Sequence, residues 1–199
     1  MEIRYILLMG TQVSRRLNAS PYYLYRLQVF CFLFFPSPFH FCIKYFHNNG
    51  IGSVIKHIPG HGLAKVDSHH NTPIVNKKYK FLANNDFYTF KNKKAFFAMT
   101  AHIIFNQIDN KFTATHSKKI IDIVRKKIGF KNILISDDLS MKSLKGNLKE
   151  NTIKTFSAGC NLALHCNGNL NEMKIVGNNS PLINPFLVKK TSQFYKILS

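Results

Sequence analysis

The sequence predicts an α/β fold with a parallel sheet of about four βα units. Short apolar runs lie near residues 54, 99, 134 and 163, and polar residues follow each of them. Segments with apolar residues at helical spacing separate these runs. Apolar runs that do not alternate with polar residues, and that are separated by helices, are typical of buried parallel strands.

Local signals place the elements more closely. Helical spacing of apolar residues at 39, 42, 43 and 46 predicts a helix that ends at Asn49-Gly50. Ser117 is expected to cap a helix that closes at Gly129, and a helix over 147–157 is expected to end at Gly159. The expected strands cover residues 53–56, 96–104, 133–135 and 162–164.

Composition limits the class of protein. The chain has 199 residues and 45% hydrophobic content, which fits one globular domain with a sizeable core. Its formal net charge is +19, from 28 Lys and Arg against 9 Asp and Glu. The basic residues are spread along the chain, so no nucleic-acid partner is expected. No membrane partner is expected either, because the apolar run Val29–Phe35 is too short to span a bilayer.

The chain divides into two parts at residue 38. Residues 1–37 show no clear βα pattern and are expected to be a divergent N-terminal extension that need not fold. Residues 38–199 are expected to form the domain. The four cysteines (Cys31, Cys42, Cys160 and Cys166) have no paired spacing, which indicates reduced thiols and a cytoplasmic location.

Chemically active residues follow each expected strand. They are Lys56 and His57, then Asp67-Ser68-His69, then His102, Asp137-Asp138 and His165. The carboxyl ends of parallel strands are where α/β barrels build active sites. A histidine paired with an aspartate can donate and accept a proton near neutral pH.

Each of these groups also has a structural interpretation. Asp67-Ser68-His69 alone is a common surface tripeptide, and Asp137-Asp138 could be a charge pair at a helix N-terminus. His102 and His165 could be hydrogen-bonded core residues or substrate contacts. The histidines at 57, 61, 69 and 70 raise the question of zinc, but Pro59-Gly60 breaks the helix that would align them. We expect no metal and no organic cofactor.

Two long motifs resemble glycoside hydrolase family 3, in particular its bacterial β-N-acetylglucosaminidases (β-N-acetylhexosaminidases). KHIPGHG at 56–62, followed by VDSH, is similar to the family's signature loop, and ISDDLSM at 135–141 is similar to its nucleophile segment. DFYTF at 86–90, MTAHI at 99–103 and AGCNLALHCNG at 158–168 also match, in the same order. The resemblance implies the C-terminal half of a (β/α)8 TIM-type barrel.

The resemblance also implies roles for the residues at matching positions. Asp137 would be the nucleophile of a retaining hydrolase, and His69 would be the acid and base, paired with Asp67. Lys56 and His57 would bind sugar hydroxyls. The implied substrate is a muropeptide that carries terminal β-linked N-acetylglucosamine, cleaved during peptidoglycan recycling.

Three hypotheses about function remain open at this point. The first is that hydrolase. The second is a catalytically inactive remnant, because no segment matches the first half of the family domain, and a half barrel leaves open strand edges that favour self-association. The third is a basic nucleic-acid-binding protein, whose binding would weaken with salt.

Overall fold

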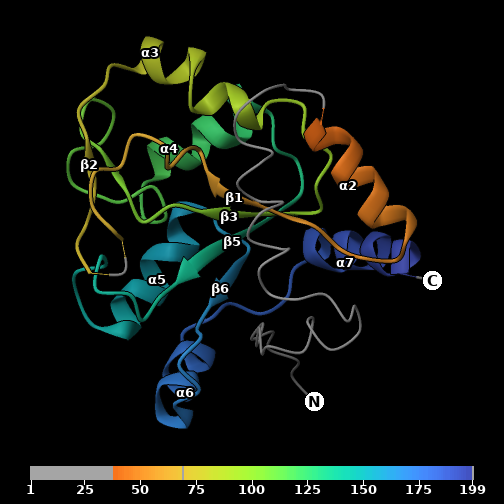
Figure 1. Ribbon diagram of the computed structural model, residues 1–199. Coiled ribbons are helices and arrows are strands. Elements are labelled where there is room, and N and C mark those ends of the chain that lie inside the picture. The colour runs from red at the N-terminus through yellow and green to blue at the C-terminus, as the bar shows by residue number, and fades with distance from the viewer. Residues whose placement is uncertain (1–37, 69, 199) are drawn as a thin grey trace.

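The computed structural model describes residues 38–68 and 70–198 (Figure 1). The predicted extension at 1–37 and His69 lie outside the described residues. The elements are, in chain order, α2 (Pro38–Asn48), β1 (Val54–Ile58), β2 (Ile74–Val75), α3 (Tyr79–Asn84), the 3-10 helix η2 (Phe87–Phe90), β3 (Phe97–Thr100), β4 (Ile104–Phe105), α4 (Lys118–Ile123), the π-helix η3 (Val124–Ile128), β5 (Ile133–Asp138), α5 (Leu148–Ala158), β6 (Leu162–Leu164), α6 (Leu170–Asn178) and α7 (Pro185–Leu198).

A four-stranded parallel sheet forms the centre of the fold, with strand order β1-β3-β5-β6. This confirms the predicted α/β fold with four βα units. The apolar run at 96–104 is not one strand, as predicted, but two. The chain leaves the main sheet after Thr100, and β4 then pairs with β2 in a separate two-stranded sheet.

The helix ends confirm the predicted cap at Ser117 and the predicted helix ends at Gly129 and Gly159. The Ser117 hydroxyl accepts the backbone N–H of Ile120 at 3.2 Å at the start of α4, and the Asn147 side chain caps α5 in the same way. Gly129 and Gly159 end their helical segments with φ of +83° and +114°. Glycine adopts this left-handed conformation without steric cost, which explains its place at both ends.

The sheet buries apolar side chains on both faces. On one face, Ile55, Ala98 and Leu134 pack in a cluster with residues of α3 and α4. On the other face, Met99 and Ile135 pack with Leu187 of α7. Helix α7 therefore covers part of this second face.

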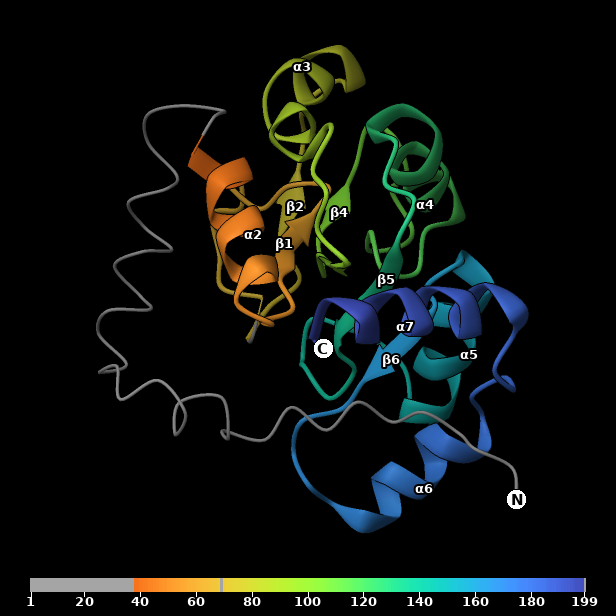
Figure 2. The same cartoon turned by 90° about the vertical axis from the view of Figure 1, so that its right-hand side faces the viewer.

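Helix α7 lies across the amino-terminal ends of the strands (Figure 2). The Phe194 ring packs against Phe97, with ring centroids 4.9 Å apart, and rests on the backbone of Gly52, where a Cβ atom would lie 2.4 Å from the ring. The Lys190 ammonium donates to the Asn132 side-chain oxygen at 2.7 Å. These contacts fix which side of α7 faces the sheet.

Candidate active site

The predicted nucleophile and a predicted sugar-binding residue lie in contact. Nε2 of His57, near the end of β1, is 3.4 Å from Oδ2 of Asp137, near the end of β5. Their side chains are 26% and 15% exposed, so both are mostly buried but still reach solvent. Lys56 is exposed beside them. The structure therefore brings together three of the five predicted site residues.

Both strands have an irregular pairing at this point. Lys56 pairs with Met99 and Ile58 pairs with Thr100, so His57 is an extra residue in the ladder. In β5, Ile135 pairs with Leu162 and Asp138 pairs with Leu164 of β6, so β5 contains one extra residue between these two pairs. Bulges of this kind occur often beside active sites, where they redirect a side chain. The sequence motifs did not reveal that both sit on bulges.

Side-chain hydrogen bonds replace the backbone hydrogen bonds that are lost at the bulge in β5. The Ser136 hydroxyl accepts the backbone N–H of Leu164 at 2.9 Å, in place of a ladder bond. The backbone N–H of Asp138 donates to Oδ1 of Asp137 at 2.9 Å. Asp137 therefore keeps one oxygen bonded to its own chain, while the other faces His57.

Asp138 has a different environment from its neighbour. Its carboxylate accepts the backbone N–H groups of Ser140 at 3.0 Å and Cys166 at 3.2 Å, and the Ser140 hydroxyl at 2.6 Å. These bonds join the loop after β5 to the loop after β6. The geometry gives Asp138 a structural role and leaves Asp137 as the carboxylate that faces the site.

The two histidines with open interpretations are core residues. His102 is fully buried, with Nδ1 2.7 Å from the Thr115 hydroxyl and Nε2 3.0 Å from the Asp138 carbonyl oxygen. His165 is also fully buried, and its Nε2 lies 3.1 Å from a Glu172 carboxylate oxygen on α6. His102 contacts the nucleophile segment directly, through the carbonyl oxygen of Asp138.

The signature loop is held by an aspartate from the DFYTF segment. A Cβ atom at Gly60 would lie 2.5 Å from the Cβ of Asp86, so only glycine allows this approach. Burial raises the pKa of Asp86, and a backbone hydrogen bond from Leu63 acts against this shift. The loop that positions His57 thus packs directly on Asp86.

Replacing Gly60 with alanine is expected to lower the thermal unfolding midpoint by several degrees, because the added methyl group must push Asp86 away. Gly62→Ala is the matched control, since a Cβ at Gly62 would meet the Asp86 carboxylate at an ordinary 3.8 Å. Differential scanning calorimetry of both variants checks this. Equal midpoints would contradict the close contact.

The predicted Asp67–His69 pair cannot be placed as a pair. Asp67 is exposed on the loop after β1. His69 lies outside the described residues, so its role stays a prediction. Nearby, Nε2 of His61 lies 3.5 Å from the Ser68 hydroxyl, and the His57 and His61 rings have centroids 5.3 Å apart. Within residues 38–68 and 70–198, no three metal-ligating side chains converge on one point.

His57 is neutral at physiological pH. Burial lowers its pKa to about 4, although the nearby Asp137 carboxylate acts in the opposite direction. Burial also lowers the pKa of His116 to about 4. A neutral imidazole at His57 can hydrogen-bond to a sugar hydroxyl through either ring nitrogen.

These two histidines predict a loss of stability in mild acid. The unfolded chain binds a proton at each of them below about pH 6.5, whereas the folded chain does so only near pH 4. As the pH is lowered from about 6.5 to about 4, the free energy of unfolding should therefore decrease, by up to about 1.4 kcal/mol per pH unit for each histidine. Urea unfolding at several pH values measures the slope. In a His57→Gln, His116→Gln double variant the slope should be shallower, and an unchanged slope would contradict the assignment.

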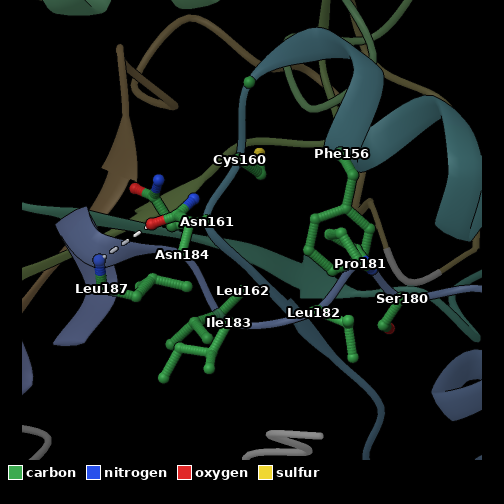
Figure 3. A pocket seen from close by; sticks show the side chains of 11 residues that line it. Phe156, Cys160, Asn161, Leu162, Ser180, Pro181, Leu182, Ile183, Asn184 and Leu187 are labelled. Carbon is green, nitrogen blue, oxygen red and sulfur yellow. Dashed lines mark hydrogen bonds between the residues drawn. The ribbon is translucent and has the colours of Figure 1, made fainter.

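A cavity lies at the start of β6, and Figure 3 shows the side chains that line it. It has a volume of about 260 Å³ and is lined by Cys160 and Leu162 at the start of β6 and by Leu182 and Leu187 near α7. The Asn184 side chain accepts the backbone N–H of Leu187 at 2.9 Å at its rim. Because it lies at the amino ends of the strands, it is separate from Asp137 and His57.

A parallel sheet with a carboxylate and an imidazole at its carboxyl edge is typical of α/β enzymes of the barrel type. The family assignment comes from comparison with known proteins. The chain belongs to glycosyl hydrolase family 3, because the model of the family's N terminal domain matches residues 40–180.

Named relatives and solved structures agree with this family. A β-hexosaminidase from Haemophilus influenzae is 33% identical over 66% of this chain and 39% of its own length. The β-hexosaminidase from Glaesserella parasuis is 36% identical over 59% of this chain and 36% of its own length. NagZ from Neisseria gonorrhoeae, solved in complex with N-trifluoroacetyl-D-glucosamine, matches with a TM-score of 0.63 and 29% identity, over 73% of this chain and 42% of that one.

The chain spans less than half the length of these relatives. A family 3 β-N-acetylglucosaminidase from Paenibacillus has a TM-score of 0.69 over 78% of this chain and 32% of its own, and at 21% identity it supports the fold alone. The family and the α/β fold are therefore shown, and they agree with the resemblance found in the sequence motifs.

Proposed function

We propose that this chain hydrolyses terminal, non-reducing β-linked N-acetylglucosamine from peptidoglycan fragments, with retention of configuration. The observation that carries the proposal is the 3.4 Å contact between Asp137 and His57 at the carboxyl edge of the sheet. In this mechanism Asp137 attacks the anomeric carbon and forms a glycosyl-enzyme intermediate. The names of the relatives, which are β-hexosaminidases, support the reaction class.

The other proposed roles are those that the family resemblance implies. His57 and Lys56 would bind sugar hydroxyls, which is supported by the contact of His57 with Asp137 and by the exposure of Lys56. His69, with Asp67, would protonate the leaving oxygen and later activate water. We also propose that the four strands are consecutive strands of a (β/α)8 TIM-type barrel, and that the substrate is a muropeptide. A cytoplasmic location is supported by the thiols of Cys160 and Cys166, which form no disulfide.

A second candidate is a protein of the same ancestry without turnover. It is favoured by the four-stranded sheet, in which β1 and β6 each pair on one side only within the described residues. A sugar site built on these strands alone has fewer walls, and orientation contributes strongly to catalytic rate. We propose that two copies of the chain associate through these two strand edges, so that the second copy closes the open sides of the site.

One experiment separates these candidates. The purified chain is incubated with 4-nitrophenyl N-acetyl-β-glucosaminide over a range of protein concentrations, and NMR identifies the anomer released first. Turnover with the β-anomer as first product supports the hydrolase, and the α-anomer would contradict a nucleophilic Asp137. Sedimentation velocity on the same samples tests self-association. Absence of turnover in both monomer and oligomer would favour the inactive protein.

A further inference from the structure

Helices α2 and α7 form one side of the molecule and contact each other (Figure 2). The side chains that turn away from the sheet are unusually apolar and basic. Phe41 and Tyr45 on α2 are 71% and 68% exposed, and Tyr195 and Val188 on α7 are 64% and 50% exposed. We call this surface the α2–α7 face; it consists of Phe41, Lys44, Tyr45, Val188, Lys189, Tyr195 and Lys196.

The outward direction of these residues is fixed by packing. Ile43 of α2 and Leu187 of α7 are buried in the two core clusters, and Phe194 packs against Phe97. On α2, Phe41 and Tyr45 lie four residues apart on the side opposite Ile43. On α7, Val188 and Tyr195 flank the stripe of Leu187 and Phe194, and Lys189 and Lys196 lie opposite it. The two neighbouring helices therefore both present aromatic and basic side chains to solvent.

Charge complementarity points to the partner. Neither helix contains an aspartate or glutamate, in a chain with a net charge of +19. Three exposed lysines lie on the same two helices: Lys44 directly precedes Tyr45, Lys196 directly follows Tyr195, and Lys189 follows Val188. Tyrosine and phenylalanine rings insert at the interface of a bilayer, and lysines next to them attract anionic headgroups.

We propose that the α2–α7 face binds the surface of an anionic phospholipid bilayer. No helix in the described part of the chain has the length and apolarity to cross a bilayer, so the contact is peripheral. From the sequence alone, no membrane partner was expected. The proposal differs because residues 41–45 and 188–196 come together only in the fold. The proposal does not depend on the hydrolase activity.

A second basic and aromatic surface provides a matched comparison. Lys77, Lys78 and Lys80 are exposed around α3, together with Tyr79 and Phe81. There, the Lys77 ammonium already lies over the Phe81 ring, 5.1 Å from its centroid. The Phe81 ring therefore already has a cation–π partner within the protein, and α3 has only 6 residues. We therefore place the bilayer contact on the α2–α7 face.

The test measures co-sedimentation of the full chain with phosphatidylcholine vesicles, with and without phosphatidylglycerol. Binding should require phosphatidylglycerol and weaken with salt. One lysine at such a surface strengthens binding about fivefold, so K44E/K189E/K196E should weaken it at least about 100-fold. F41S/Y45S/Y195S should also weaken it. The control K77E/K78E/K80E changes the net charge equally and should have little effect.

Circular dichroism checks that each variant folds, and K44Q/K189Q/K196Q replaces the charge-reversed variant if that one does not. Two results would overturn the proposal: no binding of the unaltered chain to phosphatidylglycerol vesicles, or equal weakening by the α2–α7 and α3 variants. A single-stranded oligonucleotide is tested in parallel. Binding to it that the K44E/K189E/K196E change abolishes, with no vesicle binding, would assign the face to nucleic acid instead.

Discussion

Replacing Asp137 with asparagine is expected to lower hydrolysis of 4-nitrophenyl N-acetyl-β-glucosaminide by at least about a thousandfold. The amide oxygen can still accept the backbone N–H of Asp138, which Oδ1 of Asp137 now accepts at 2.9 Å, so the local fold should survive. The amide cannot attack the anomeric carbon as a carboxylate does. Steady-state kinetics of both proteins measure the loss as kcat/KM.

Two other carboxylates serve as controls for this substitution. Asp138→Asn keeps an amide oxygen that can accept the Ser140 and Cys166 backbone N–H groups, but it replaces the oxygen that accepts the Ser140 hydroxyl. We therefore expect a lower unfolding free energy with less effect on rate per folded molecule. Asp122→Asn changes an exposed carboxylate that pairs with Lys118 on α4, and the rate should stay the same. Full activity of the Asp137 variant would contradict the proposal that Asp137 is the nucleophile.

The sequence predicted the sheet well because the strands are buried on both faces. Ile133, Leu134 and Ile135 are all nearly inaccessible, so the strand consists of consecutive apolar residues that stand out from their surroundings. The cap at Ser117 was predictable for a similar reason, since one side chain satisfies one nearby backbone group. Local chemistry determined these features.

The arrangement of the site depended on contacts between distant segments. His57 and Asp137 are 80 residues apart in the chain, and their contact requires a bulge in each strand. The motifs identified both residues but assigned His57 to the substrate alone. The support of Gly60 by Asp86 was missed in the same way. Motif order predicts which residues gather, but packing determines which of them touch.

The cover that α7 forms over the sheet was the largest feature that the sequence did not predict. Its apolar residues have ordinary helical spacing, which does not reveal what surface they face. In the structure, Leu187 is 7% exposed and packs with Met99, Ile133, Ile135 and Leu164. Burial of this face by the chain's own helix reduces the need for a second chain to cover it.

Replacing Leu187 with aspartate is therefore expected to destabilise the fold by more than about 3 kcal/mol, because it puts a carboxylate without a partner into an apolar cluster. Val188→Asp is the matched control on the same helix. Val188 is 50% exposed, so the same charge there should change stability by no more than about 0.5 kcal/mol. Urea unfolding followed by circular dichroism measures both.

The two variants together test whether α7 belongs to the core. If α7 only rested loosely on the sheet, the Leu187 and Val188 substitutions would have similarly small effects. If α7 seals the inner face, the Leu187 variant should also bind a hydrophobic dye and aggregate, because Met99, Ile135 and Leu164 become exposed. Phe194→Ala should show a smaller loss of the same kind, since the ring that covers Gly52 and Phe97 is removed while no charge is buried.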